Sequence, residues 1–335
     1  MQEEVLTAPE IRALADRFVW LAVDTDRPEN AEHVRRYPPV AWPTFLVLDP
    51  TTGAVRARLV GGASKAQFRA FLDAGAADRG SAAEAALRAA HAAEDEGAWA
   101  EAAAAYQQAI DALPEAYPRR PEVLLGRIRA LRRAGAFEPC VELARRRGHE
   151  TGRAAAAADF AFYALACARA LDAPRAARAA LPPLARRVTE AARAEGGPMS
   201  ADDRSDALRI AREIALFLGE EAKARALARE QRAVVDAAMS AAESPAVAST
   251  FNWPAAEVYA FLGEHEALIP TLRRSVEALP DQYDPPYRLA WLLLEAGRPD
   301  EARPFAERAR ARVYGPRTAQ VEALLERIDA ARAAK

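Results

Sequence analysis

Short apolar runs alternate with helical patterns over the first seventy-five residues. Residues 18–24 (FVWLAVD) and 44–49 (TFLVLD) are rich in β-branched and aromatic side chains and too short for helices, so we predict two strands. The turn sequence DPTTG leads into residues 54–60 (AVRARLV), which we expect to return as an antiparallel strand. Residues 29–37 are predicted to form a short helix, and a capping box at residues 64–67 (SKAQ) is predicted to begin another. This part of the chain is therefore expected to be an α/β domain.

From about residue 80 onward, the strand pattern gives way to helical periodicity interrupted by glycine. Gly263 and Gly297 are 34 residues apart, and a small residue, Ala302, follows the second of them after five positions. A period of this length is typical of helical hairpins that stack on one another. The apolar spacing of residues 321–328 (VEALLERI) predicts a terminal capping helix. Turns are expected at Gly97, Gly135, Gly219, Gly263 and Gly297, with Asp172 in a similar position.

Two of these segments resemble the tetratricopeptide (TPR) repeat, a helix–turn–helix unit. They are residues 97–114 (GAWAEAAAAYQQAIDALP) and 290–309 (AWLLLEAGRPDEARPFAERA). The resemblance implies an all-α TPR-type solenoid of six repeats, of which the third and fourth are weak, with a protein or peptide as partner. We therefore expect a domain of residues 1–75 followed by helical repeats over residues 76–335.

The first domain resembles the C-terminal part of a thioredoxin domain. The matching segments are residues 18–26 (FVWLAVDTD), 37–50 (YPPVAWPTFLVLDP) and 53–72 (GAVRARLVGGASKAQFRAFL). The resemblance implies a partial thioredoxin-like α/β fold with a cis peptide bond before Pro43. It also implies that Trp42, Pro43 and Thr44 form a loop that holds substrate peptide.

The chain lacks the CxxC motif in which thioredoxin-like chemistry resides, so we predict no catalytic residues in it. The family's strand between those matching 18–24 and 44–49 also has no counterpart. We hypothesise a start codon assigned too far downstream, with the missing strand and the cysteines encoded upstream. The competing hypothesis is a degenerate, non-catalytic remnant.

Charge and hydropathy exclude several classes of partner. The 46 basic and 48 acidic side chains are interspersed and give a net charge of −2, which predicts no nucleic-acid partner. No apolar run is long enough for a membrane span. As written the chain is expected to be cytoplasmic, and an exported or periplasmic location becomes possible if the true N-terminus lies upstream.

Cysteine and histidine residues give no sign of a cofactor or metal site. Cys140 and Cys167 are too few for a disulfide framework and are predicted to be buried, inert thiols. The four histidines share no zinc-ligand spacing with them, and His91 and His265 are expected to be surface or groove residues. The arginine-rich stretch 144–150 (ARRRGHE) is interpreted as a solvated helix end rather than a phosphate site.

Four aromatic residues of the second half are candidates for a binding groove. Aromatic side chains on the first helix of adjacent repeats can anchor a bound segment. They can equally fill the hydrophobic core, where many of the other side chains are small alanines. The predicted function is a non-catalytic, peptide-binding scaffold. The alternatives are a thiol–disulfide oxidoreductase with its cysteines upstream, and an assembly factor using only the repeats; the oligomeric state stays open. The candidate groove residues are Trp253, Tyr259, Tyr287 and Trp291.

Overall fold

The computed structural model describes residues 5–39, 41–77, 81–171, 174–194 and 196–334. These residues form two compact units. Unit 1 consists of Met1–Leu21 and Tyr37–Ala224, and unit 2 of Ala22–Arg36 and Arg225–Lys335. The predicted α/β residues that follow Tyr37 thus pack in the same unit as several of the helical hairpins. The domain boundary predicted at residue 75 stays a prediction.

A two-stranded antiparallel sheet forms at two of the three predicted strands. Strand β1 (Thr44–Leu48) pairs with β2 (Val55–Val60), with Phe45 opposite Leu59. The irregular register next to Leu48 falls where the turn joins the strands. The prediction of an antiparallel return strand is confirmed.

The prediction of a strand at residues 18–24 is wrong. These residues have no regular secondary structure, and Val19 and Leu21 are 91% and 82% exposed. Within the described residues, no strand lies beside them to complete a hydrogen-bonded ladder. Local strand propensity does not form a strand without such a partner. The helix predicted at residues 29–37 is present as a 3₁₀ turn (Pro28–Asn30) followed by α2 (Ala31–Arg36).

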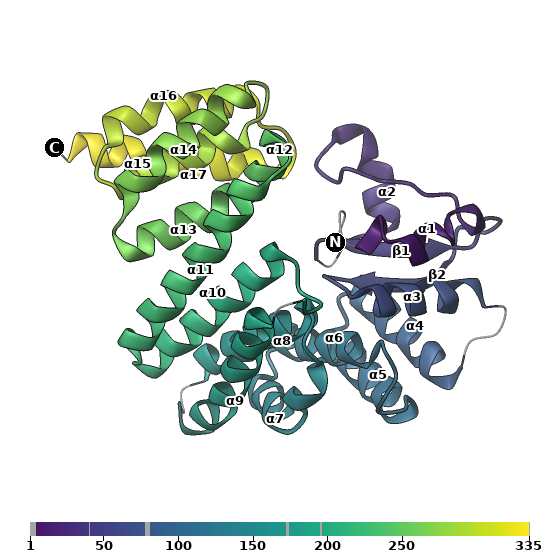
Figure 1. Ribbon diagram of the computed structural model, residues 1–335. Coiled ribbons are helices and arrows are strands. Elements are labelled where there is room, and N and C mark those ends of the chain that lie inside the picture. Colours follow the sequence, from purple (N-terminus) through teal and green to yellow (C-terminus); the bar gives the residue numbers. More distant parts are fainter. Residues whose placement is uncertain (1–4, 40, 78–80, 172–173, 195, 335) are drawn as a thin grey trace. The chain divides into compact units, whose positions relative to one another are not determined.

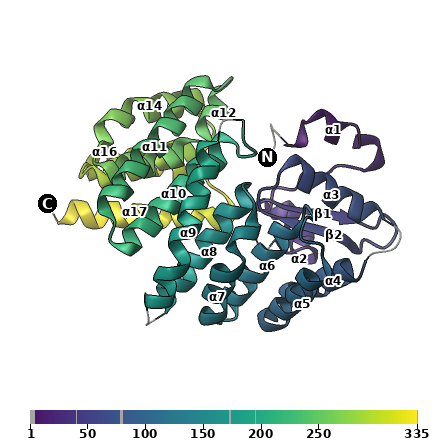
Figure 2. The same cartoon turned by 60° about the horizontal axis from the view of Figure 1, so that its bottom comes forward.

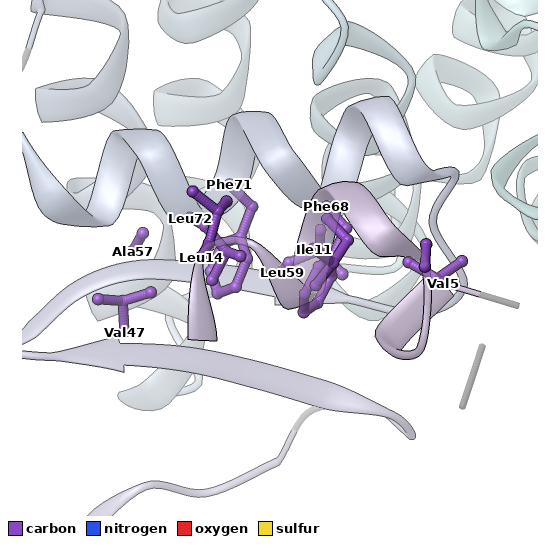
Figure 3. Close-up of a cluster of buried hydrophobic side chains, with 10 residues drawn as sticks. Val5, Ile11, Leu14, Val47, Ala57, Leu59, Phe68, Phe71 and Leu72 are labelled. Atoms are coloured by element: carbon purple, nitrogen blue, oxygen red, sulfur yellow. The ribbon is translucent and has the colours of Figure 1, made fainter. Parts of the chain in front are cut away.

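Helix α3 (Lys65–Ala76) covers one face of the sheet. The predicted capping box begins it, with Gln67 N donating to Ser64 Oγ and Ser64 N donating to the Gln67 side chain. Figure 3 shows Phe68 and Phe71 directed from this helix towards the strands. Residues from the first turns of the chain, including the short helix α1 (Pro9–Arg12), complete this core.

The opposite face of β2 is covered by helix α4 (Ala82–Asp95). Because side chains alternate across a strand, Arg58 points away from the α3 side, to which Leu59 belongs. The Arg58 guanidinium is buried and binds Asp95 with an N–O distance of 2.7 Å. The sheet is therefore an integral layer of unit 1.

Beyond α4 the chain is helical. Consecutive helices pack as antiparallel neighbours, for example α4 on α5 and α15 on α16 (Figures 1 and 2). The longest helices, α9, α10 and α11 with 20, 18 and 21 residues, belong to the weak third and fourth repeats. The bounds are α5 Trp99–Ala112, α6 Arg120–Arg133, α7 Phe137–Arg147, α8 Ala155–Ala170, α9 Pro174–Arg193, α10 Ala201–Leu218, α11 Glu221–Ala241, α12 Pro245–Ser249, α13 Asn252–Leu262, α14 His265–Ala278, α15 Asp284–Glu295, α16 Pro299–Arg310 and α17 Thr318–Ala333.

Glycines in the left-handed region terminate the first helix of several hairpins. Gly219 and Gly263 are C-caps with φ of 80° and 77°, a conformation that glycine adopts without a steric penalty. The predicted turns at Gly97, Gly135 and Gly297 likewise have positive φ. Asp172 lies outside the described residues. The final helix, α17, buries the apolar side of residues 321–328, as predicted for a capping helix.

The two cysteines form a disulfide, which corrects the prediction of free thiols. Cys140 of α7 and Cys167 of α8 are fully buried, as predicted, but their sulfur atoms are bonded. The sequence separation of 27 residues carries no information about this proximity, which comes from the packing of the two helices.

His91 is a core residue rather than a surface or groove residue. It is buried in α4, edge-on to Tyr106 at 5.9 Å. Burial, together with Arg58, Arg119 and Arg129, holds the pKa of His91 well below its usual value, so the ring is neutral. His265, the other histidine assigned to the surface, is partly exposed. None of the described helices combines the length and apolar character that crossing a membrane requires.

Candidate functional site

The loop that enters β1 presents an exposed tryptophan. The Trp42–Pro43 peptide bond is cis, and Trp42 is 68% exposed. Pro43 O accepts a hydrogen bond from Gly61 N (2.8 Å), and Thr44 Oγ1 donates one to Ala41 O (2.6 Å). The backbone on both sides of Pro43 is therefore held in place while Trp42 faces solvent.

Acidic side chains lie close to this loop, and the sequence pattern did not single them out. Gly61 has a φ of +88°, and a Cβ atom there would lie 3.2 Å from Asp159 Oδ2 of α8. A Cβ atom at Gly62 would lie 3.6 Å from Asp203 Oδ1 of α10. Burial, reinforced by the charges of Asp206 and Asp203, raises the pKa of Asp159 to about 7.

Three of the four predicted groove aromatics form a contact cluster with an arginine in unit 2. Trp253 of α13 and Trp291 of α15 lie edge to face, with ring centroids 5.0 Å apart. The Arg288 guanidinium lies 4.6 Å from the Trp253 ring centroid and 4.9 Å from that of Tyr287. We call Trp253, Tyr287, Arg288 and Trp291 the Trp–Arg cluster.

Arg288 is fixed within the Trp–Arg cluster. It forms an ion pair with Asp284, one helical turn earlier, at 2.9 Å. Its Nε atom is buried without a hydrogen-bond partner. Trp253 is 36% exposed, so part of its ring is open to a partner while the cation beside it is already in place.

Tyr259, the fourth predicted residue, belongs to a different contact. Its hydroxyl binds Asp236 of α11 at 3.0 Å, and Arg232 lies over its ring. Burial and the hydrogen bond to Asp236 raise the pKa of Tyr259 to about 12. The Tyr259 hydroxyl is thus bonded to α11, and we do not include Tyr259 in the candidate site.

Sequence reasoning missed Arg288, although the signal was present. Asp284 and Arg288 are four residues apart, and an aromatic residue lies directly before the arginine and three residues after it. On a helix, such spacing puts the carboxylate, the cation and one aromatic ring on a common side. Across the part of the chain that the structure describes, no three His, Cys, Asp or Glu residues are grouped so that they could hold a metal ion.

The sequence matches no protein-family model and no curated protein. Several solved structures are similar to parts of the chain. The MamA protein shares 15% identity at a TM-score of 0.33, covering 69% of this chain and 91% of its own. The APC/C hetero-tetramer Cut9–Hcn1 shares 11% identity at a TM-score of 0.40, covering 73% and 42%. A thermophilic TPR protein from Thermus thermophilus shares 17% identity at a TM-score of 0.33, covering 75% and 100%.

The packing of this chain's own helices supports the assignment of helical repeats. Within unit 1 each helix from α4 to α10 packs on the next, and within unit 2 each helix from α13 to α17 does so; glycine turns separate several of the pairs. The protein is therefore mostly helical, with a solenoid-like series of hairpins and a small two-stranded sheet.

Proposed function

We propose that the protein is a non-catalytic scaffold whose helical repeats bind a segment of a partner protein through the Trp–Arg cluster. The observation that carries this proposal is the position of Arg288 against the Trp253 and Tyr287 rings, with Trp253 still partly exposed. Rigid aromatic side chains and arginine dominate the binding energy of protein interfaces because they bury a large area at a low entropic cost.

The cluster favours a particular kind of partner side chain. Arg288 already occupies the cation position over the rings, so a lysine or arginine of the partner would meet a like charge. An apolar or aromatic side chain can instead cover the open part of Trp253. A neighbouring carboxylate of the partner would complement Arg288, whose charge only Asp284 now balances at close range among the described residues.

The finer assignment of residues 1–75 as a thioredoxin-like remnant also belongs to this proposal. The hairpin of β1 and β2, the capping box of α3 and the exposed Trp42 support a second peptide contact at Trp42, Pro43 and Thr44. We further propose an oxidising compartment, because a buried disulfide is typical of proteins outside the reducing cytoplasm. Acid quenching of intact cells followed by alkylation of the denatured, unreduced protein tests this, because both cysteines are buried in the native state; two alkylated cysteines would contradict it.

A peptide selection tests the scaffold proposal. Peptides selected from a random library on the full chain are measured by fluorescence anisotropy against wild type, Trp253→Ala and Trp291→Ala. The matched control is Tyr259→Phe, which alters an aromatic residue of the same unit outside the cluster. We expect the alanine variants to lose about 2 kcal/mol, or roughly thirtyfold in affinity, and the control to bind normally. Peptides that bind all four proteins equally would overturn the proposal, as would a library that yields no binder.

A further inference from the structure

A cavity of about 230 Å³ lies in unit 1, where the end of α7 meets α9. The 3₁₀ turn Gly148–Thr151, which follows α7, forms one wall, and the middle of α9 forms another. Its lining includes Arg145, His149, Arg153, Arg186, Arg187 and Glu190. None of these residues belongs to the Trp–Arg cluster or to the loop at Pro43.

Part of the lining is apolar, and a glycine lies in close contact with it. Ala144, Ala180, Pro183 and Leu184 contribute to the lining. A Cβ atom at Gly148 would lie 2.4 Å from Leu184 Cδ2, so a larger residue there would require the Leu184 side chain to shift.

The charge of the lining is strongly positive. The lining holds four arginines and one carboxylate, that of Glu190, which lies 4.0 Å from Arg186. Arg145 is paired with Glu142, which does not line the cavity. Arg153 and Arg187 have no ion-pair or hydrogen-bond partner within the described ranges of the chain. This local excess of positive charge contrasts with a net charge of −2 for the whole protein.

The acidic residues nearest in sequence already form ion pairs with arginines other than Arg153 and Arg187. Glu142 binds Arg145 and Arg146, and the hydrogen bond from Arg145 is the main cause that lowers the pKa of Glu142 to about 2. Glu150 binds Arg147 and Arg120. Neither carboxylate is therefore available to neutralise Arg153 or Arg187.

The helix dipole does not account for this arrangement. Arginines at the end of α7 complement its C-terminal carbonyl groups, as the sequence interpretation of residues 144–150 assumed. Arg186 and Arg187 lie inside α9, and Arg153 lies between helices. Their convergence with Arg145 on one cavity needs a different explanation.

We propose that this cavity binds a phosphate monoester. Guanidinium groups donate paired hydrogen bonds that match the oxygens of a phosphate, and several of them can surround one dianion. The volume is below the roughly 300 Å³ at which pockets for drug-sized ligands begin, so the ligand is a phosphate group with a short organic stem rather than a nucleotide. A phosphorylated serine and a free phosphorylated metabolite share this chemistry.

Calorimetric titration of the full chain with O-phosphoserine, inorganic phosphate, serine and ATP tests the proposal. The variants are Arg153→Gln and Arg187→Gln. The control is Arg146→Gln, an exposed arginine of α7 that does not line the cavity. We expect saturable binding of O-phosphoserine that each cavity variant weakens at least tenfold and that the control leaves unchanged, with no binding of serine. Native hydrogen exchange of α7 and α9 verifies that each variant is folded.

The ligand series separates the possible sources of phosphate. Tighter binding of O-phosphoserine than of inorganic phosphate supports a phosphorylated side chain or metabolite, and a phosphoserine peptide that binds more tightly still assigns the site to a phosphoprotein. Equal binding of phosphate and O-phosphoserine would show that the organic stem contributes nothing and would overturn the assignment to a monoester. No saturable binding, preferential binding of ATP, or equal weakening by Arg146→Gln would overturn the proposal. Because the Trp–Arg cluster is untouched by these variants, the result is independent of the peptide-binding proposal.

Discussion

The disulfide between Cys140 and Cys167 makes a strong quantitative prediction. It closes a loop of 27 residues within the helical part of unit 1. The loop-closure model assigns about 3.5 kcal/mol to a cross-link over this length, because the disulfide removes conformational freedom from the unfolded chain. Reduction should therefore lower the free energy of unfolding of unit 1 by about that amount.

Hydrogen exchange followed by mass spectrometry measures this effect within one molecule. Oxidised protein is compared with protein refolded and kept in a thiol reductant. A loss of about 3.5 kcal/mol corresponds to roughly 300-fold faster exchange of the most protected amides of α6 to α8. Amides of α13 to α16 in unit 2 serve as the internal control and should exchange at unchanged rates.

Two results would refute this reasoning. If thiol titration of the denatured, unreduced protein finds two free cysteines, the disulfide does not exist. If the disulfide exists but reduction leaves the exchange of α6 to α8 unchanged, loop closure does not contribute to the stability of unit 1. A double Cys140→Ala and Cys167→Ala variant should lose at least as much stability as the reduced protein, since it also leaves small cavities in a buried region.

Three further predictions concern the packing and electrostatics of unit 1. Gly75→Ala should lower the free energy of unfolding of unit 1 by about 1–3 kcal/mol in urea unfolding, because the new Cβ would lie 2.6 Å from Val47 Cβ. Adding Val47→Ala should relieve part of this loss. Strictly additive effects of the two substitutions would contradict the predicted clash. Glu94→Gln should lower the free energy of unfolding by about 3–5 kcal/mol, because Arg129, which donates to Glu94 at 2.6 Å, would remain buried without its counter-charge. The control is Glu142→Gln at an exposed position, which should have little effect. The raised pKa of Asp159, about 7, means that this carboxyl holds its proton more tightly in the folded than in the unfolded state, so the free energy of unfolding should fall as pH rises from about 4 to 7. Asp159→Asn should flatten this pH dependence. An unchanged pH profile in the variant would contradict the assignment.

Local signals in the sequence predicted local structure well. The capping box at Ser64 and Gln67 begins α3, and the glycines at 97, 135, 219, 263 and 297 all have positive φ. In each case the residues that determine the conformation lie within one helical turn of it. Strand β1 was also predicted because its apolar run is short and bounded by proline on both sides.

Features that depend on distant residues were not predicted. The spacing of Cys140 and Cys167 does not reveal that α7 and α8 bring them together. His91 looks like an ordinary helical residue in sequence, and its burial results from neighbours on α5 and on β2. The cavity lined by Arg153 and Arg187 joins two segments whose charges are ordinary when each is considered alone.

The segment that follows Leu21 shows how tertiary contacts override a local pattern. Residues 18–24 have strand propensity, yet the chain passes from unit 1 to unit 2 within them. In unit 2, Asp24 accepts a hydrogen bond from the Tyr314 hydroxyl and Asp26 one from Arg317, across about 290 residues of sequence. A continued strand would carry these two carboxylates on the same side of an extended ladder. Instead, Asp26 N donates to Asp24 Oδ1 in a turn, the conformation in which both side chains reach their partners. Contacts with the end of the helical array thus stabilise the turn at Asp24 and Asp26 in place of a continued strand.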